Sequence, residues 1–257
     1  MPEGDTVFRT AQRLHEALAG RAVTRFEIRV PRAAAADLTG ETVEEVVARG
    51  KHLLVRIGEW TLHSHLKMDG EWRVYRVGEP WRVPSHKARA IVQNADRQAV
   101  GFDLAMVDVL PTREEANVVG HLGPDLLGDD WDLAEAARRV AADPRPIHVA
   151  LLDQRHLAGF GNEYANELLF VRGILPFRPA TEVDVVPLLE TGMRMIRANR
   201  DRPVRTFTGD TRPGATTWVY GRARRPCRRC GTAIESGQLG ADPTRQRTVF
   251  WCPRCQR

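Results

Sequence analysis

Four cysteines near the end of the sequence have the spacing of metal ligands. They form two Cys-x2-Cys pairs separated by 21 residues: Cys227 with Cys230, and Cys252 with Cys255. Two such pairs can each place two thiolates on one tetrahedral Zn²⁺, and the segment between them then closes as a hairpin. Two disulfides or a redox pair are the alternative, which is disfavoured because a cytosolic protein rarely keeps stable disulfides and no βαβ pattern surrounds either pair. We therefore predict one structural zinc ion, since four thiolates leave the metal no open position for chemistry.

The first residues of the sequence could supply a nucleophile. Met1 is removable because a small residue follows it, and its removal would make Pro2 the N-terminus. An α-amino group titrates near pH ~8, so a usable fraction is neutral and can attack a carbonyl-like carbon to form a Schiff base. Glu3 adds a carboxyl group that could act as general acid or base beside this amine. Taken alone, the two residues are better explained as the ordinary start of a helix.

Positive charge is concentrated in the same C-terminal segment as the cysteines. The 257-residue chain has 38 Lys and Arg against 33 Asp and Glu, a net charge of +5. Residues 222–257 hold nine Arg and two acids, which gives 9 − 2 = +7 and leaves 5 − 7 = −2 for residues 1–221. Arginine pairs well with phosphates, so this distribution indicates a polyanionic partner. A solvated basic face is an equally good interpretation of the charge by itself.

The first half of the chain must position Pro2 and Glu3. Apolar residues at helical spacing, from Val7 to Leu18, predict one amphipathic helix that ends at Gly20. Eight short β-rich runs with no helix between them then predict an antiparallel β-sandwich or barrel. These runs are 22–29, 42–49, 52–57, 60–64, 71–77, 89–95, 98–103 and 106–110.

The second half of the chain has a helical pattern. Asp132 and Glu135 resemble a capping box for a helix that reaches about Ala142. Further helices are expected at 147–154, from Asn162 to Arg172, and at 183–198, with a Gly-rich turn before Asn162. The fold class is therefore α+β. We divide the chain into a β-sandwich domain (2–120), a linker (121–131), a helical domain (132–221) and a zinc hairpin (222–257).

Composition indicates a folded protein of the cell interior. The chain is 42% hydrophobic and 28% charged, which is typical of globular proteins. No run of about 18 apolar residues is long enough for a membrane span, and the first residues do not form a signal peptide. We expect a cytoplasmic protein with no membrane partner.

Seven short motifs extend from the start of the chain to its end. They are Met-Pro-Glu-Gly at 1–4, Arg-Gly-Lys-His-Leu-Leu at 49–54, His-Leu-Lys-Met-Asp-Gly-Glu-Trp at 65–72, His-Leu-Gly-Pro-Asp at 121–125, Leu-Ala-Gly-Phe-Gly-Asn-Glu-Tyr-Ala at 157–165, Val-Tyr-Gly-Arg at 219–222 and Gln-Arg-Thr-Val-Phe-Trp-Cys-Pro-Arg-Cys-Gln at 246–256. In this order the sequence resembles the formamidopyrimidine-DNA glycosylase and endonuclease VIII family, and in particular its bacterial endonuclease VIII-like branch in actinobacterial form.

The resemblance implies roles for five residues in removing an oxidised base and cleaving the strand. Pro2 matches the proline whose nitrogen attacks the sugar C1′ as the base leaves, and Glu3 matches the acid that assists ring opening. Lys51 matches a phosphate-contacting lysine with an acid role in β-elimination, rather than an ordinary turn lysine. Asn162 matches the asparagine of the helix-two-turn-helix motif, where an N-cap role is the compatible alternative. Arg247 matches the phosphate-binding arginine of the zinc hairpin, assigned to δ-elimination, although it could be one more basic residue of the tail.

Three further residues are candidates for DNA contacts. Met68 could occupy the space of a flipped-out base, with Lys67 reaching the backbone or the opposite base. A place for Met68 in the hydrophobic core is an equally good interpretation. His121 matches a basic phosphate-contacting position, and a turn-capping histidine is the alternative.

Some positions depart from the family pattern. Thr6 stands where many relatives have a carboxylate, so the supporting role of that group does not transfer. Asp69 stands where some relatives have an aromatic residue or threonine, which argues against a full three-residue wedge. The segment 208–218 is short, as in branches without the long loop that closes over 8-oxoguanine, and this favours oxidised pyrimidines.

Our prediction is a monomeric, bifunctional DNA glycosylase and abasic-site lyase of base excision repair. It would act on double-stranded DNA that contains oxidised bases or abasic sites, in the bacterial cytoplasm. Three alternatives stay open: a non-catalytic zinc-finger DNA-binding protein, a glycosylase for formamidopyrimidine and 8-oxoguanine lesions, and a lyase with little glycosylase activity.

Overall fold

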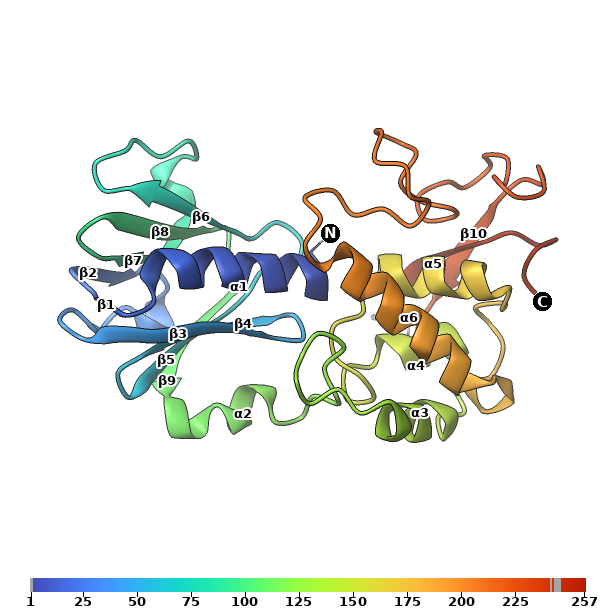
Figure 1. Ribbon diagram of the computed structural model, residues 1–257, viewed down its shortest axis with the longest axis horizontal. Helices are drawn as coiled ribbons and strands as arrows, with labels where there is room; N and C mark the ends of the chain where they lie inside the picture. The colour runs from blue at the N-terminus through green and yellow to red at the C-terminus, as the bar shows by residue number, and fades with distance from the viewer. Residues whose placement is uncertain (1, 241, 243–245) are drawn as a thin grey trace. The chain divides into compact units, whose positions relative to one another are not determined.

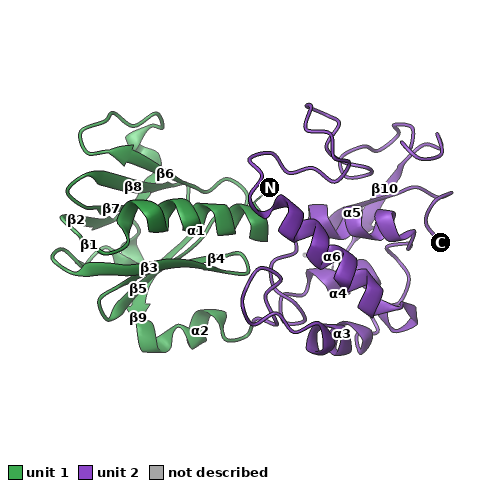
Figure 2. Ribbon diagram, in the orientation of Figure 1, with its two compact units in different colours: residues 1–121 green, residues 122–257 purple. Residues whose placement is uncertain are grey.

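The structure is a computed structural model that describes residues 2–240, 242 and 246–257. The chain forms two compact units, residues 1–121 (unit 1) and residues 122–257 (unit 2) (Figure 2). The finer four-part division drawn from the sequence stays a prediction. None of the described helices is long and apolar enough to cross a bilayer.

Unit 1 begins with the amphipathic helix α1 (Gly4–Leu18), as the spacing of its apolar residues predicts. Val7, Leu14 and Leu18 are each 1% exposed and face the strands of the same unit. Gly20 follows the helix with φ 72°, a left-handed conformation that glycine adopts without strain. The helix therefore ends where the sequence predicts.

Two antiparallel sheets make up the rest of unit 1 (Figure 1). The strands are β1 (Arg21–Ala22), β2 (Arg25–Ile28), β3 (Thr42–Arg49), β4 (His52–Ile57), β5 (Trp60–His65), β6 (Glu71–Arg76), β7 (Ala88–Gln93), β8 (Arg97–Phe102) and β9 (Met106–Pro111). Their order is β1-β3-β4-β5-β9 in one sheet and β2-β7-β8-β6 in the other. Three 3-10 turns and the short helix α2 complete the unit: Pro31–Ala33, Ser85–Lys87, Thr112–Glu114 and Ala116–Val119. The antiparallel sheets confirm the predicted α+β class.

One predicted strand is wrong. The run 22–29 is predicted to be a single strand, but its first residue, Ala22, ends β1, which pairs with β3, and Arg25–Ile28 form β2, which pairs with β7 in the other sheet. The backbone crosses between sheets at Val23 and Thr24, whose N–H groups donate to Glu41 and Gln93 carbonyls at 2.8 and 2.7 Å. A β-rich run cannot reveal such a crossing, because strand propensity does not encode which sheet a residue joins.

The core of unit 1 combines side chains from both sheets and from α1. Val46 and Leu53 come from the five-stranded sheet, Phe26 and Val92 from the four-stranded sheet, and Leu14 from the helix. Burying apolar surface from three elements in one cluster fixes the helix against the strands.

Unit 2 is helical and ends in a two-stranded hairpin (Figure 1). Its elements are α3 (Leu133–Ala141), α4 (Ile147–Leu152), α5 (Asn162–Arg172), a 3-10 turn (Ala180–Glu182), α6 (Val185–Arg200), β10 (Glu235–Leu239) and β11 (Arg247–Trp251). Asp132 caps α3, since its Oδ1 accepts the Glu135 N–H at 3.0 Å. The Glu135 carboxylate pairs instead with Arg138 and Arg139, at 2.8 and 2.7 Å. Only the aspartate half of the expected capping box is therefore seen.

Asn94 connects the end of α1 to the β7–β8 turn. Its side chain is buried, with the residue 2% exposed, and its Nδ2 donates to the Ala17 carbonyl at 2.9 Å. Its Oδ1 accepts the N–H groups of Asp96 and Arg97, at 3.0 and 2.8 Å. One amide thus satisfies three backbone groups and joins the helix to the four-stranded sheet.

We expect Asn94→Ala to lower the free energy of unfolding by about 1–3 kcal/mol, because the Ala17 carbonyl loses a buried donor and two N–H groups of the turn lose their acceptor. Urea denaturation measures this loss. Asp96→Ala is the matched control in the same turn: it removes an exposed ion pair with Arg21 and should cost less than about 1 kcal/mol. Equal costs for the two variants would contradict the role given to Asn94.

Candidate functional site

Pro2 lines a cavity of about 830 Å³ in unit 1. Pro2 is half-buried and precedes α1, and Thr6 lines the same cavity one turn further along the helix. Leu66 and Gly70, at the two ends of the β5–β6 loop, contribute another part of the wall. The structure therefore places the predicted nucleophile beside the loop predicted to enter the DNA.

Glu3 is fully buried at the N-cap position of α1. Its backbone carbonyl accepts the N–H groups of Thr6 and Val7, at 2.9 and 3.0 Å. The main chain of Glu3 therefore starts the helix, and its carboxyl group lies one residue from Pro2. The helix-start interpretation of Pro2 and Glu3 is correct and is compatible with a chemical role for both.

Lys51 lies in the tight turn between β3 and β4. Gly50, with φ 58°, occupies the left-handed position of this turn, and Arg49 and His52 are paired on either side. Lys51 is half-buried. A two-residue turn between long strands holds the lysine in a defined place, as a phosphate contact requires.

Four histidines cluster beside Lys51. The His52 ring lies 5.1 Å from that of His63, 5.0 Å from that of His65 and 6.2 Å from that of His121, measured between centroids. Burial, together with the neighbouring histidines and Lys51, lowers the pKa of His52 to about 3. Burial and the charges of Lys67 and Lys51 lower the pKa of His65 to about 4. At neutral pH these two rings are uncharged, so they add no positive charge beside Lys51.

The β5–β6 loop holds its exposed tip through His65. The His65 Nδ1 accepts the Lys67 N–H at 2.9 Å, and Lys67 has φ 53°, a left-handed conformation that is rare for a lysine. Met68 is 63% exposed, so its assignment to the core is wrong. The loop presents an apolar side chain to solvent beside Lys67, which suits a side chain that replaces a base in the stack.

His121 is the last residue of unit 1 and is exposed. Through its contact with His52 it belongs to the same group as Lys51. Unit 1 thus contains two neighbourhoods: Pro2 with Leu66 and Gly70 of the β5–β6 loop around the cavity, and Lys51 with His121 around the histidines.

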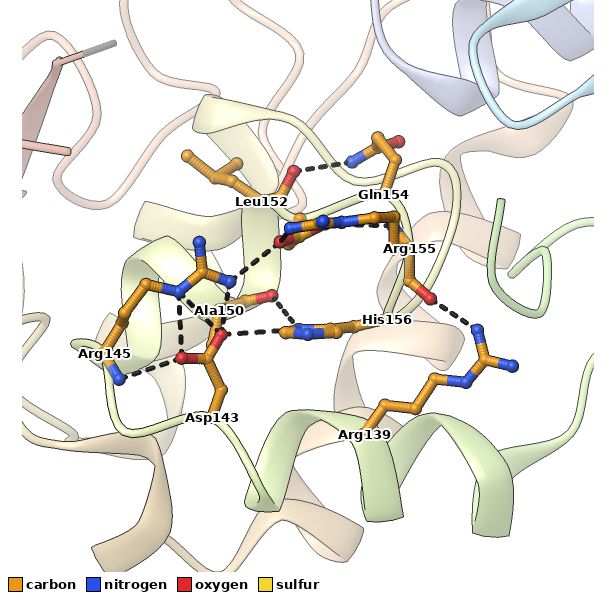
Figure 3. Close-up of polar contacts among 9 residues, drawn as sticks. Arg139, Asp143, Arg145, Ala150, Leu152, Gln154, Arg155 and His156 are labelled. Carbon is orange, nitrogen blue, oxygen red and sulfur yellow. Dashed lines mark hydrogen bonds and ion pairs between the residues drawn. The ribbon is translucent and has the colours of Figure 1, made fainter. Parts of the chain in front are cut away.

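Ion pairs build the turn that follows α4 in unit 2 (Figure 3). The Asp153 carboxylate pairs with Arg145 at 2.8 Å and with Arg155 at 2.6 Å. Hydrogen bonds from both arginines hold the pKa of Asp153 far below its usual value, and the bond from Arg155 has the larger effect. The Arg155 carbonyl in turn accepts from Arg139 Nη1 at 2.6 Å, which attaches the turn to α3.

Gln154 shapes the glycine-rich segment before α5. Its Nε2 donates to the carbonyls of Leu152 and Phe160, both at 3.0 Å, and its Oε1 accepts the Gly159 N–H at 3.1 Å. Gly159 has φ 110°, which a residue with a side chain rarely adopts. The turn between α4 and α5 therefore depends on this glycine.

Asn162 is the first residue of α5 and is only 7% exposed. The N-cap is Gly161, so the N-cap interpretation of Asn162 is wrong. Its Nδ2 instead donates to the Thr248 carbonyl of β11 at 2.9 Å. Arg247, the residue before Thr248, is exposed at the start of β11. The structure thus joins Asn162 to the backbone of the residue after Arg247, 86 positions away in the sequence.

Glu167 is a buried residue of α5 that the sequence pattern did not single out. Its carboxylate accepts the N–H groups of Trp218, Val219 and Tyr220, at 2.8, 2.9 and 2.8 Å. Burial raises the pKa of Glu167 to about 7, against the lowering effect of these three donors. The Val-Tyr-Gly-Arg motif is therefore fixed to α5 by one carboxyl group.

The four cysteines meet around one point. Their Sγ atoms all lie within 4.8 Å of one another, with Cys227–Cys255 at 4.0 Å and Cys230–Cys252 at 3.4 Å. All four are free thiols, so the disulfide alternative is wrong. Four sulfurs at ~2.3 Å from a tetrahedral zinc ion would be separated by roughly 3.8 Å, so the cluster fits such an ion.

Two arginines of the basic tail, Arg222 and Arg228, donate hydrogen bonds to backbone carbonyls of unit 2. Arg222 is 8% exposed and its Nη2 donates to the Pro226 carbonyl at 2.9 Å. Arg228 donates to the Gly214 and Thr217 carbonyls, at 2.7 and 3.1 Å. The tail is therefore not a uniformly solvated basic face.

Comparison with known proteins identifies the class. The formamidopyrimidine-DNA glycosylase N-terminal domain matches residues 1–109, and the formamidopyrimidine-DNA glycosylase H2TH domain matches residues 122–189. The chain therefore belongs to the formamidopyrimidine-DNA glycosylase and endonuclease VIII family, which confirms the resemblance in the sequence.

Particular relatives are similar over the whole chain. "Probable endonuclease 8 2" of Streptomyces coelicolor is 53% identical, covering 100% of this chain and 94% of its own length. "DNA-(apurinic or apyrimidinic site) lyase Nei2" of Mycolicibacterium smegmatis is 49% identical, covering 100% and 99%. The fold is also that of Lactococcus lactis Fpg, solved in complex with an abasic site containing DNA, with a TM-score of 0.80, 24% identity and full coverage of both chains.

We expect the stability of the protein to depend on the protonation of Glu167. The native carboxyl, with its pKa near 7, holds its proton more tightly than an unfolded one with a pKa of ~4.3, so the free energy of unfolding falls as the pH rises through this interval and then levels off. The total fall should be roughly 2–4 kcal/mol.

Urea denaturation at several pH values between 4 and 8 measures this dependence. Glu167→Gln should flatten the profile, whereas Glu235→Gln, at an exposed position of β10, should leave it unchanged. An identical pH profile in wild type and Glu167→Gln would show that Glu167 does not titrate in this range.

Proposed function

We propose that the protein is a bifunctional DNA glycosylase and abasic-site lyase that removes oxidised bases, with pyrimidine lesions preferred. The observation that carries this proposal is the position of Pro2 on the wall of a cavity, next to the buried Glu3. Relatives named as endonuclease 8 and as a lyase for abasic sites, at 53% and 49% identity over the whole chain, support the same activity.

In the proposed reaction the Pro2 nitrogen attacks the sugar C1′ and the base leaves. Glu3 then assists opening of the sugar ring, as a carboxyl group adjacent to the nucleophile can. Lys51 serves as the acid in β-elimination. The exposed Arg247 contacts the phosphates and acts in δ-elimination.

We further propose that one zinc ion is bound by Cys227, Cys230, Cys252 and Cys255. A metal with four thiolate ligands supplies structure and no chemistry. It would hold both cysteine turns at the base of the β10–β11 hairpin, whose β11 strand begins with Arg247. DNA binding would therefore depend on the metal through this hairpin.

DNA contacts are proposed for four residues. Asn162 and the exposed Lys67, Met68 and His121 would grip the backbone or fill the space left by the flipped base. We propose that the protein acts as a monomer in the bacterial cytoplasm, on double-stranded DNA.

A second candidate function is an abasic-site lyase with little activity on intact lesions. The observation that favours it is the lyase name of the relative at 49% identity, together with Thr6 on the cavity wall where many family members have a carboxylate. Duplexes with thymine glycol, dihydrouracil, 8-oxoguanine or an abasic site separate the two candidates. Cleavage of the abasic duplex alone would favour the lyase.

We expect an N-terminal extension to abolish covalent trapping, because it converts the Pro2 amine into an amide that is not nucleophilic. Borohydride trapping on an abasic duplex should fall by roughly 100-fold or more while the extension is present. The matched control is the same preparation after proteolytic removal of the extension, with Pro2 as its first residue. Equal trapping before and after cleavage would exclude Pro2 as the nucleophile.

We expect removal of zinc to abolish DNA binding and strand cleavage together. Elemental analysis should give one zinc ion per chain, and Cys252→Ser should reduce this content. Restoring zinc, but not magnesium, to the chelated protein should restore binding, because thiolates prefer zinc. Strong cleavage by a demonstrably zinc-free protein would contradict the structural role of the metal.

A further inference from the structure

A buried network of polar side chains joins α4, α5 and β11. His148 from α4 is 0% exposed, and Asn162 and Asn166 from α5 are 7% and 1% exposed. Their hydrogen bonds reach the backbone of Thr248 and Phe250 in β11. Buried polar groups are costly unless they are paired, so the network constrains the arrangement of these three elements.

The backbone partners determine which way each group points. The Thr248 carbonyl can only accept, so the Asn162 Nδ2 donates to it at 2.9 Å and the Asn162 Oδ1 points away from β11. This Oδ1 lies 3.0 Å from His148 Nε2, which therefore carries the hydrogen. The Asn166 Nδ2 lies 3.3 Å from the same nitrogen, but its two hydrogens have closer acceptors in the carbonyl and Oδ1 of Asn162. Burial lowers the pKa of His148 to about 4, in agreement with a neutral ring that has one proton.

Asn166 completes the network from the next turn of α5. Its Oδ1 accepts the Phe250 N–H at 2.6 Å, and its Nδ2 donates to the Asn162 carbonyl at 2.7 Å and to the Asn162 Oδ1 at 3.1 Å. Asn162 Oδ1 thus receives two donors, one from His148 and one from Asn166. Rotating the Asn162 amide by half a turn would bring two oxygens together at Thr248 and donors against donors at His148.

The two asparagines also satisfy one edge of β11. In a strand, backbone groups of alternate residues point to the same side, so the Thr248 carbonyl and the Phe250 N–H lie on a common edge. The other neighbour of β11 is β10, its partner in the hairpin. The amides of α5 therefore occupy the place of a third strand and fix the position of β11 along the helix.

We propose that His148 and Asn166 are positioning residues for DNA binding. They hold Asn162 in one amide orientation and hold β11 in one position, so that Arg247, the residue before Thr248, is presented at a fixed place. The proposal rests on the proposed function, in which Asn162 and Arg247 contact the DNA backbone. It adds that Asn162 has one N–H committed to Thr248 and offers its second N–H to a phosphate oxygen.

The test separates binding from chemistry. We expect His148→Leu to weaken binding to a duplex with a tetrahydrofuran abasic analogue about tenfold, measured by fluorescence anisotropy, since one buried acceptor loses its strong donor. The single-turnover rate of β-elimination on an abasic duplex at saturating protein, which does not involve Arg247, should stay within about twofold of wild type.

Two matched variants distinguish positioning from loss of stability. His148→Gln keeps an amide donor near the place of Nε2 and should recover most of the affinity. Val149→Ala, a buried neighbour on α4 without a polar group, should lower stability and leave the affinity unchanged. If His148→Leu does not fold, as judged by circular dichroism and zinc content, Asn166→Asp replaces it, because it keeps the acceptor for Phe250 and removes the donor to Asn162.

A double-mutant cycle tests whether the network acts through Arg247. The losses in affinity of His148→Leu and Arg247→Ala should be less than additive, because a displaced arginine has little affinity left to lose. Wild-type affinity in His148→Leu and Asn166→Asp, or full additivity with Arg247→Ala, would overturn the inference. A wild-type protein that neither cleaves nor is trapped on the abasic duplex would instead overturn the proposed function.

Discussion

Buried hydrogen bonds from α5 to the backbone of residues 218–220, 248 and 250 attach the C-terminal segment to the helices of unit 2. The apolar cluster that this segment shares with α5 is small and includes two of the cysteines. Three polar side chains of α5 add to these apolar contacts. Each binds a backbone group of the segment: Asn162 binds Thr248, Asn166 binds Phe250 and Glu167 binds Val219. An unpaired buried group costs about 1–3 kcal/mol, so a displaced segment would lose several such contributions at once. The position of the β10–β11 hairpin therefore depends on its hydrogen bonds to α5.

Much of this fold could be predicted because it depends on local signals. Helix α1 follows from apolar periodicity, the α3 start from Asp132, and the cysteine cluster from spacing alone. The division of 22–29 into β1 and β2 could not be predicted, since strand propensity does not encode which sheet a residue joins. Met68 shows a related limit: an apolar residue in a β-rich half is as compatible with the core as with an exposed loop tip.

The candidate site could also be predicted in part, from motif resemblance and not from local propensity. Motif resemblance located Asn162 and Arg247 but not the contact of Asn162 with Thr248, which spans 86 positions. Asn166 and Glu167 look like solvent-facing residues, because polar side chains on a helix usually are. Their burial depends on the segments packed over α5, which come from distant parts of the sequence. His148 gives no signal in the sequence for the same reason.

The burial of Arg222 changes how the formal charge of residues 222–257 relates to DNA binding. Nucleic-acid binding gains much of its free energy when condensed counterions leave phosphates that protein cations neutralise. A buried guanidinium group that binds carbonyls, as that of Arg222 does, is poorly placed to displace such ions. The number of sodium ions released on association should therefore reflect the outward-facing cations and fall below the formal +7 of residues 222–257.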